Sequence, residues 1–101
     1  MTLRGKDRAA LRGEANRLSA TVHVGHQGVV PGTVQSLDDA LRTRELVKVQ
    51  LSRHSDRTPK AIAQELAAAT QSEVIQVIGR RATFFRFNPD NDESRGQSPE
   101  A

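Results

Sequence analysis

The sequence predicts an α/β fold in which helices pack on a four-stranded mixed sheet, with the element order α-β-α-β-α-β-β. Apolar residues change along the chain between a helical spacing of three or four and the alternation of a strand. The last two strand patterns are joined by a short link that begins with glycine. Strands that alternate with helices and end in a hairpin are typical of one mixed sheet. Because all seven elements are short, we expect one sheet face to stay partly open.

The first helix is expected at residues 5–19, where Leu11, Ala15 and Leu18 form an apolar stripe at i, i+4 and i+7. A short alternating strand follows at residues 21–24. The pattern then predicts a second helix.

The second helix is indicated by Val30, Val34, Leu37 and Leu41, which repeat at i, i+4, i+7 and i+11. Pro31 suits its first turn, where a helix needs no N–H group for its internal bonds. The segment therefore predicts a helix with one clean apolar face.

A second strand is expected at residues 45–51, with Val47, Val49 and Leu51 on one face and Lys48 on the other. This alternation is typical of a strand that is buried on one side. Lys48 would then reach the open side of the sheet.

The third helix is expected to begin at Thr58, which reads as an N-cap followed by Pro59 in the first turn. Ile62, Leu66 and Ala69 are expected to form its buried stripe. A polar loop separates this helix from the strand before it.

The final hairpin is expected from strands at residues 73–78 and 82–87 around the link Gly79-Arg80-Arg81. Phe85 and Phe87 share a face, and we expect this pair to pack in the core. A base-stacking platform of aromatic residues is not expected, because the chain has 3 Phe and no Tyr or Trp.

The domain is expected to span residues 1–88, followed by a disordered acidic tail at residues 89–101, which is rich in Asp, Asn, Ser, Gly, Gln and Pro. The net charge of the whole chain is +3, so the acidic tail leaves a more basic body. Most of the basic residues are arginine, whose planar guanidinium matches phosphate geometry. A small, basic, arginine-rich domain suggests a nucleic acid or an acidic surface as partner.

Other function classes find little support in the sequence. There is no cysteine, which excludes disulfides and Cys-based metal sites. No apolar run approaches the roughly 18 residues of a membrane span, and the N-terminus lacks the apolar region of a signal peptide. His23, His26 and His54 are scattered, without a metal-binding spacing, and no P-loop or nucleophile relay is present. We therefore expect a cytoplasmic, non-catalytic protein without metal, cofactor or membrane contact, and we favour a monomer.

The junction between the first strand and the second helix carries the sequence Gly25-His26-Gln27-Gly28. Glycine tolerates positive φ and lets a backbone approach a ligand closely, and a helix N-terminus attracts anions. A G-x-x-G loop can clamp a nucleic-acid backbone, as in KH modules. The alternative is a tight turn in which both glycines are only conformational.

Basic residues outside this loop are further candidates for phosphate contacts. For those on the first helix the alternative is a solvated helix flank. Arg44 could equally pair with Glu45 or with the acidic pair Asp38-Asp39. The candidates are Arg8, Arg12, Arg44, Lys48, Arg80, Arg81 and Arg86.

Four segments occur in a characteristic order: LRGEANRL, VHVGHQGV, ALRTRELVKVQL and IQVIGRRATFFRF. Together they resemble the CRM domain family in its single-domain bacterial form, the YhbY-type proteins, over residues 5–87. The resemblance implies an RNA-binding α/β domain, similar to the C-terminal domain of translation initiation factor 3. It also implies association with precursors of the large ribosomal subunit. By position, the clamp becomes Gly25 to Gly28, although His26 and Gln27 stand where the family often has a basic residue.

The sequence thus favours a ribosome assembly factor that binds ribosomal RNA of the large-subunit precursor through the G-x-x-G loop and a basic face. An alternative from another class is a protein-docking module on the ribosome or the translation initiation machinery. A third hypothesis, an enzyme that binds a nucleotide phosphate at the glycine loop, lacks a catalytic constellation.

Overall fold

The structure is a computed structural model that describes residues 5–25, 28–53 and 57–87. The expected tail at residues 89–101, with the domain boundary before it, lies outside the described residues, as do His26, Gln27 and His54. The predicted element order and the mixed sheet are confirmed. The elements are α1 (Gly5–Ala15), β1 (Val22–Val24), α2 (Pro31–Thr43), β2 (Leu46–Leu51), α3 (Pro59–Thr70), β3 (Glu73–Ile78) and β4 (Arg81–Phe85).

The four strands lie in the order β1-β2-β4-β3. β1 and β2 are parallel, whereas β4 is antiparallel to both of its neighbours. The carboxyl ends of β1 and β2 therefore meet at the same edge of the sheet. The β3–β4 turn lies at this edge too, because Arg81 pairs with Gln50 of β2 and with Ile78 of β3.

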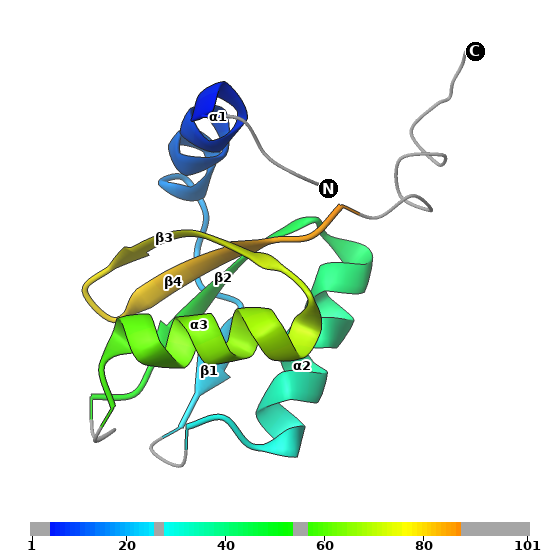
Figure 1. Ribbon diagram of the computed structural model, residues 1–101, viewed down its shortest axis with the longest axis vertical. Coiled ribbons are helices and arrows are strands. Elements are labelled where there is room, and N and C mark those ends of the chain that lie inside the picture. Colours follow the sequence, from blue (N-terminus) through cyan, green and yellow to red (C-terminus); the bar gives the residue numbers. More distant parts are fainter. Residues whose placement is uncertain (1–4, 26–27, 54–56, 88–101) are drawn as a thin grey trace.

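Two helices cover one face of the sheet and one covers the other (Figure 1). α2 packs on β1 and β2, α3 packs on β3 and β4, and α1 lies across β2 and β3 on the opposite face. The main core is the layer between the sheet and the α2–α3 pair. Its largest fully buried side chains include Phe84, Leu37, Leu41, Leu51, Ile62 and Leu66.

The predicted core faces of two elements are confirmed. Val47, Val49 and Leu51 of β2 are all buried in the main core. Leu37 and Leu41 of α2 are buried beside them. The helical and strand periodicities of the sequence therefore identified the inward faces of α2 and β2.

The stripe predicted for α3 is right at Ile62 and Leu66 but wrong at Ala69, which is exposed. Thr70 takes the next buried position, four residues after Leu66, and is 3 % exposed. Its hydroxyl donates to the Leu66 carbonyl at 2.8 Å, which satisfies the polar group inside the helix. A prediction based on apolar residues at helical spacing does not include a buried threonine of this kind.

α1 ends at Ala15, four residues before the predicted end. The N–H groups of Arg17 and Leu18 bond to carbonyls three residues back, both at 3.1 Å, so the chain tightens and leaves the helix there. Ala15 itself is fully buried, which is consistent with the predicted stripe. The shorter helix leaves part of the sheet face beneath it uncovered.

The prediction for the aromatic residues is only half right. Phe85 is buried, but Phe87 lies beyond the end of β4 and is 42 % exposed. Phe84, on the other face, is the largest side chain of the main core. Both faces of β4 are covered near Phe85, so two consecutive phenylalanines are buried.

In the part of the chain that the structure describes, no helix is long and apolar enough to cross a membrane.

Candidate nucleic-acid interface

Three connections meet at the edge of the sheet where β1 and β2 end. The Ser52 N–H donates to the Val24 carbonyl at 3.0 Å, and the Leu51 N–H donates to the Arg80 carbonyl at 2.7 Å. The Arg80 guanidinium donates back to the Ser52 carbonyl at 3.2 Å. These bonds hold together the start of the G-x-x-G connection, the β2–α3 connection and the β3–β4 turn. We call this edge, with the helix starts beside it, the basic end.

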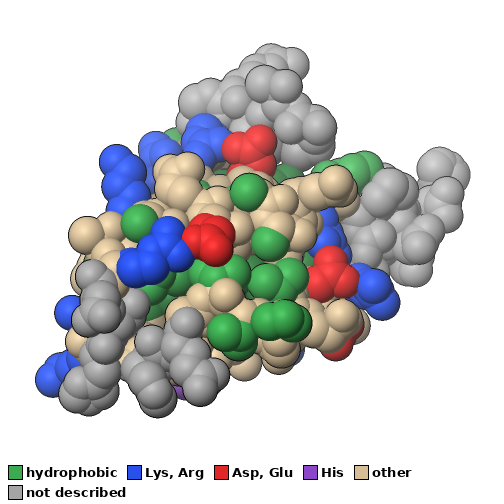
Figure 2. Space-filling view, turned by 60° about the horizontal axis from the view of Figure 1, so that its bottom comes forward, with side chains coloured by type: hydrophobic (Ala, Val, Ile, Leu, Met, Phe, Trp, Pro, Cys, Tyr) green, Lys and Arg blue, Asp and Glu red, His purple; other side chains and the backbone are tan. Residues whose placement is uncertain are grey.

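The basic end is named for its cations, which come from segments far apart in the sequence. Arg53 and Arg81 are exposed and have no hydrogen-bond or ion-pair partner among the described residues. They line a shallow open hollow together with Gln50 and Arg80. In Figure 2 several Lys and Arg side chains lie on the left of the view, and an acidic side chain lies against one group of them. The described cations of this end are Arg53, Arg57, Lys60, Arg80 and Arg81.

Both long helices of the α2–α3 layer begin at the basic end, so the positive ends of their dipoles face it. α3 begins with a side-chain cap, because the Thr58 hydroxyl accepts the Ala61 N–H at 3.1 Å. The N-cap residue of α2 is Val30, which has no polar side chain and forms no such cap. Because Pro31 has no N–H, the open donors next to the G-x-x-G connection are the N–H groups of Gly32 and Thr33.

The two glycines of the G-x-x-G connection differ in what the fold requires of them. The Gly28 N–H donates to the Gly25 carbonyl at 3.0 Å, and Gly28 has φ 77°, a conformation that favours glycine. Gly25 has no positive φ, and a Cβ added there would meet no atom within 4 Å. The fold thus explains Gly28 but leaves Gly25 unexplained. His26 and Gln27, the other two predicted clamp residues, lie outside the described residues.

Lys48 lies on the sheet face opposite the main core, half-buried, as predicted from its alternation with Val47 and Val49. It pairs in register with Thr83 of β4, and Gln50 pairs with Arg81. The face that α1 leaves uncovered therefore continues from the basic end towards Lys48.

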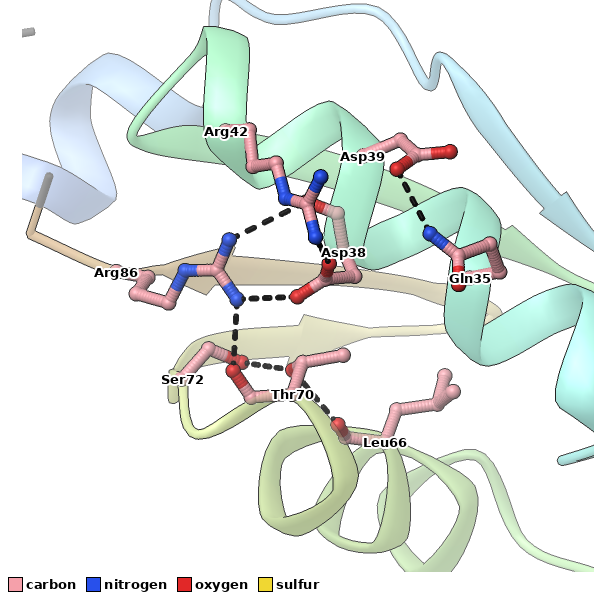
Figure 3. Close-up of polar contacts among 8 residues, drawn as sticks. All are labelled: Gln35, Asp38, Asp39, Arg42, Leu66, Thr70, Ser72 and Arg86. Carbon is pink, nitrogen blue, oxygen red and sulfur yellow. Dashed lines mark hydrogen bonds and ion pairs between the residues drawn. The ribbon is translucent and has the colours of Figure 1, made fainter.

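The opposite edge of the sheet has arginines too, but their charges are paired (Figure 3). The Arg86 guanidinium donates to the Asp38 carboxylate at 2.7 Å, to the Thr70 carbonyl at 2.9 Å and to the Asp38 carbonyl at 3.2 Å. Arg42 pairs with the same carboxylate at 3.0 Å. The hydrogen bond from Arg86, followed by the charges of Arg86 and Arg42, lowers the pKa of Asp38 despite its partial burial. We call this network the paired end.

Besides Arg86, three more predicted site residues lie away from the basic end. Arg8 joins α1 to β3, because it donates to the Glu73 carboxylate at 3.0 Å and to the Val74 carbonyl at 2.6 Å. Arg12 is exposed on α1. Arg44 is exposed at the C-cap of α2, and no ion pair joins it to the acidic residues considered for it.

The sequence interpretation missed three cations of the basic end: Arg53, Arg57 and Lys60. Arg57 forms an ion pair with Glu65, whereas Arg53 and Lys60 have no partner among the described residues. Their segment was read only as a polar loop and a helix start. The available signal was topological, since a loop after a strand parallel to β1 must lie beside the G-x-x-G connection.

Comparison with known proteins gives matches over nearly the whole chain. The profile of the CRS1 / YhbY (CRM) domain family matches residues 3–86. The "Probable RNA-binding protein YqeI" of Bacillus subtilis is 28% identical over 91 residues, which are 90% of this chain and 95% of the relative. An "RNA-binding protein" of Haemophilus influenzae is 28% identical over 98 residues, which are 97% of this chain and 96% of the relative.

A solved structure is similar as well. The solution structure of the hypothetical protein SAV1595 from Staphylococcus aureus matches with a TM-score of 0.77 and 32% sequence identity. The match covers 91% of this chain and 96% of that chain. The likeness thus extends over most of both chains.

Proposed function

We propose, since this chain belongs to the CRS1 / YhbY (CRM) domain family, that it binds RNA through the basic end. The observation that carries this proposal is the meeting of three connections. It gathers Arg53, Lys60 and Arg81, which have no acidic partner among the described residues, beside a helix start without a side-chain cap. Relatives named as RNA-binding proteins support the choice of RNA over other polyanions.

Binding at this end would combine two kinds of phosphate contact. Arg53 and Arg81 offer guanidinium forks that nothing in the described structure occupies. The open N–H groups at the start of α2 would hold a second phosphate beside Gly25, where a backbone without a side chain allows close approach. These contacts position the chain on RNA without reading its sequence.

Within this proposal the chain is a non-catalytic ribosome assembly factor, and its target is ribosomal RNA of the large-subunit precursor. The resemblance of the ordered sequence motifs to the YhbY-type proteins supports that role. Arg8 and Arg86 are left out of the proposed surface because carboxylates already bind them. Arg44 is left out because it lies at the other end of the sheet.

A charge-matched pair of variants tests the location of the surface. Arg53→Ala with Arg81→Ala removes from the basic end two cations that have no partner among the described residues. Arg42→Ala with Arg44→Ala removes two cations from the opposite end of the sheet, one paired with Asp38 and one exposed. We expect the first variant to bind single-stranded RNA about tenfold more weakly, and the second to bind within about twofold of the wild type. Titrations at several salt concentrations should show a shallower slope for the first variant only, by about 0.7 for each lost contact.

Equal weakening by both variants would contradict the proposed location, because net charge alone would then explain the binding. RNA binding that is independent of salt would contradict the phosphate contacts. Ribonuclease treatment of cell extracts before sedimentation tests the target: we expect it to release the chain from large-subunit precursors. Co-sedimentation that survives this treatment would favour docking on a protein.

A further inference from the structure

A small pocket lies on the sheet face beneath the C-terminal end of α1. It has a volume of about 180 Å³ and lies between Asn16, just after α1, and the strands β2, β3 and β4. Its wall is formed by Lys48, Gln76 and Thr83, which pair in one row across the three strands, and by Ile78 and Arg81 in the next row. Arg81 also lines the hollow of the basic end, so the two depressions adjoin.

Thr83 is the unusual member of this wall. It is 1 % exposed, and its hydroxyl has no hydrogen-bond partner among the described residues. Buried polar groups in proteins are almost always satisfied by protein, water or a ligand, so the Thr83 hydroxyl in the pocket wall is a donor available to water or to a ligand. Lys48, paired with Thr83 in register, likewise has an ammonium without a partner in residues 5–25, 28–53 and 57–87.

The remaining wall supplies an apolar surface and a fixed amide. Ile78 is 60 % exposed, which is unusual for a large aliphatic side chain in a strand. The Gln76 amide donates to the Asn16 side chain at 3.0 Å, which holds Gln76 in place and leaves its own oxygen as an acceptor. The pocket therefore offers an aliphatic surface together with an ammonium, a hydroxyl and an amide.

We propose that this pocket receives one unstacked RNA base, and that the base carries a carbonyl oxygen on its edge, as uracil does. The inference rests on the proposed function, because the phosphates on either side of the base would be held at the basic end. Single-stranded RNA is commonly read through bases that are splayed out of the stack. The pocket is smaller than the roughly 300–1,000 Å³ of typical small-molecule sites, so it suits one flat ring better than a whole nucleotide. Lys48 and Thr83 donate hydrogen bonds, and a carbonyl oxygen accepts them, whereas adenine has no carbonyl.

The test uses three single strands of equal length: oligouridine, oligoadenosine and an abasic ribose-phosphate strand. The wild type should bind oligouridine about tenfold more tightly than the abasic strand and several-fold more tightly than oligoadenosine. Thr83→Val removes the hydroxyl but changes no charge and little volume. We expect it to abolish most of the preference for oligouridine while leaving the affinity for the abasic strand and the salt slope unchanged.

Stability separates this role from a structural one. Since the Thr83 hydroxyl has no partner in the described structure, Thr83→Val should melt at the same temperature as the wild type or higher. Thr21→Val, outside the pocket, is the matched control and should bind all three strands as the wild type does. Lys48→Met should lose the preference for oligouridine as well, with some loss of affinity for every strand because a charge is removed.

Two results would overturn the inference and leave the proposed function intact: equal binding of oligouridine and the abasic strand by the wild type, or an unchanged preference in Thr83→Val. Failure of the wild type to bind any of the three strands would instead contradict the proposed function, and the base pocket with it.

Discussion

The two ends of the sheet contain the same kind of residue in opposite states. At the paired end, the Arg86 guanidinium lies against a carboxylate and two carbonyls, and its side chain is 21% exposed. At the basic end, Arg53 and Arg81 are exposed and unpartnered among the described residues. The difference lies in what surrounds each arginine. The Arg86 guanidinium forms hydrogen bonds within the fold, whereas the guanidinium donors of Arg53 and Arg81 are available to a ligand.

The comparison separates stability from binding in a physically simple way. A guanidinium with satisfied donors contributes to folding, and withdrawing it leaves polar groups without partners. A solvated guanidinium contributes little to folding, but it gains strong contacts when a phosphate arrives. Substitutions at the paired end should therefore change the melting temperature, and those at the basic end should change RNA affinity.

The largest expected effect is on stability and comes from Arg86→Met. It leaves the Thr70 carbonyl without its side-chain donor and leaves the Asp38 carboxylate with Arg42 alone, which should cost about 2 kcal/mol. For a domain of this size the melting temperature should fall by roughly 10 °C. Thermal melts beside Arg44→Met provide the control, because its guanidinium is exposed and has no partner among the described residues.

RNA affinity of Arg86→Met, measured below its melting temperature, tests the other side of the comparison. We expect it to equal that of the wild type. A loss of affinity in the folded variant would return Arg86 to the RNA surface, as the sequence first suggested.

The next effect is on binding and comes from His26→Asp combined with Gln27→Asp in the G-x-x-G connection. Two negative charges near the start of α2 would repel a phosphate, so affinity should fall roughly ten- to hundredfold. The melting temperature should change little, because acidic groups are favourable near a helix N-terminus. Wild-type affinity in the folded double variant would mean that the connection is only a turn.

A smaller effect should distinguish the two glycines. Gly28→Ala forces an alanine into φ near 77° and should cost about 1 kcal/mol of stability. Gly25→Ala meets no atom within 4 Å and should change stability by less than about 0.5 kcal/mol. It should nevertheless bind RNA several-fold more weakly, because a methyl group would separate the backbone from a phosphate. Equal RNA affinities of Gly25→Ala and the wild type would argue against close backbone approach.

The smallest expected effect is the pH dependence of the paired end. Because the pKa of Asp38 is lowered in the folded protein, its contribution to stability is present above the ordinary Asp pKa of about 3.9. That contribution is lost as the pH falls through the folded-state value. Asp38→Asn should therefore be less stable than the wild type at pH 6–7, and the gap should narrow below pH about 4. A gap that stays constant in melts from pH 7 to pH 3 would contradict this linkage.

The sequence was sufficient for the elements and for much of the core. The alternation of Val47, Val49 and Leu51 and the helical spacing of Leu37 and Leu41 are local properties, and the buried faces follow them. The N-cap at Thr58 was also predicted from its neighbours alone. The local pattern was wrong at Phe87. It continued the alternation of the strand, but β4 ends at Phe85 and the Phe87 side chain is exposed.

Only the tertiary structure decided what each arginine does. Arg81 and Arg86 lie five residues apart in one hairpin segment, and no local pattern shows which of them has a carboxylate partner. Strand order places Arg86 beside Asp38 of α2 and Arg81 beside the β2–α3 connection, both distant in sequence. The strand order also places Lys48, Thr83 and Gln76 in one row across three strands, and this row forms a wall of the pocket. Periodicity determines which way a side chain faces, whereas its partners depend on the pairing of distant strands.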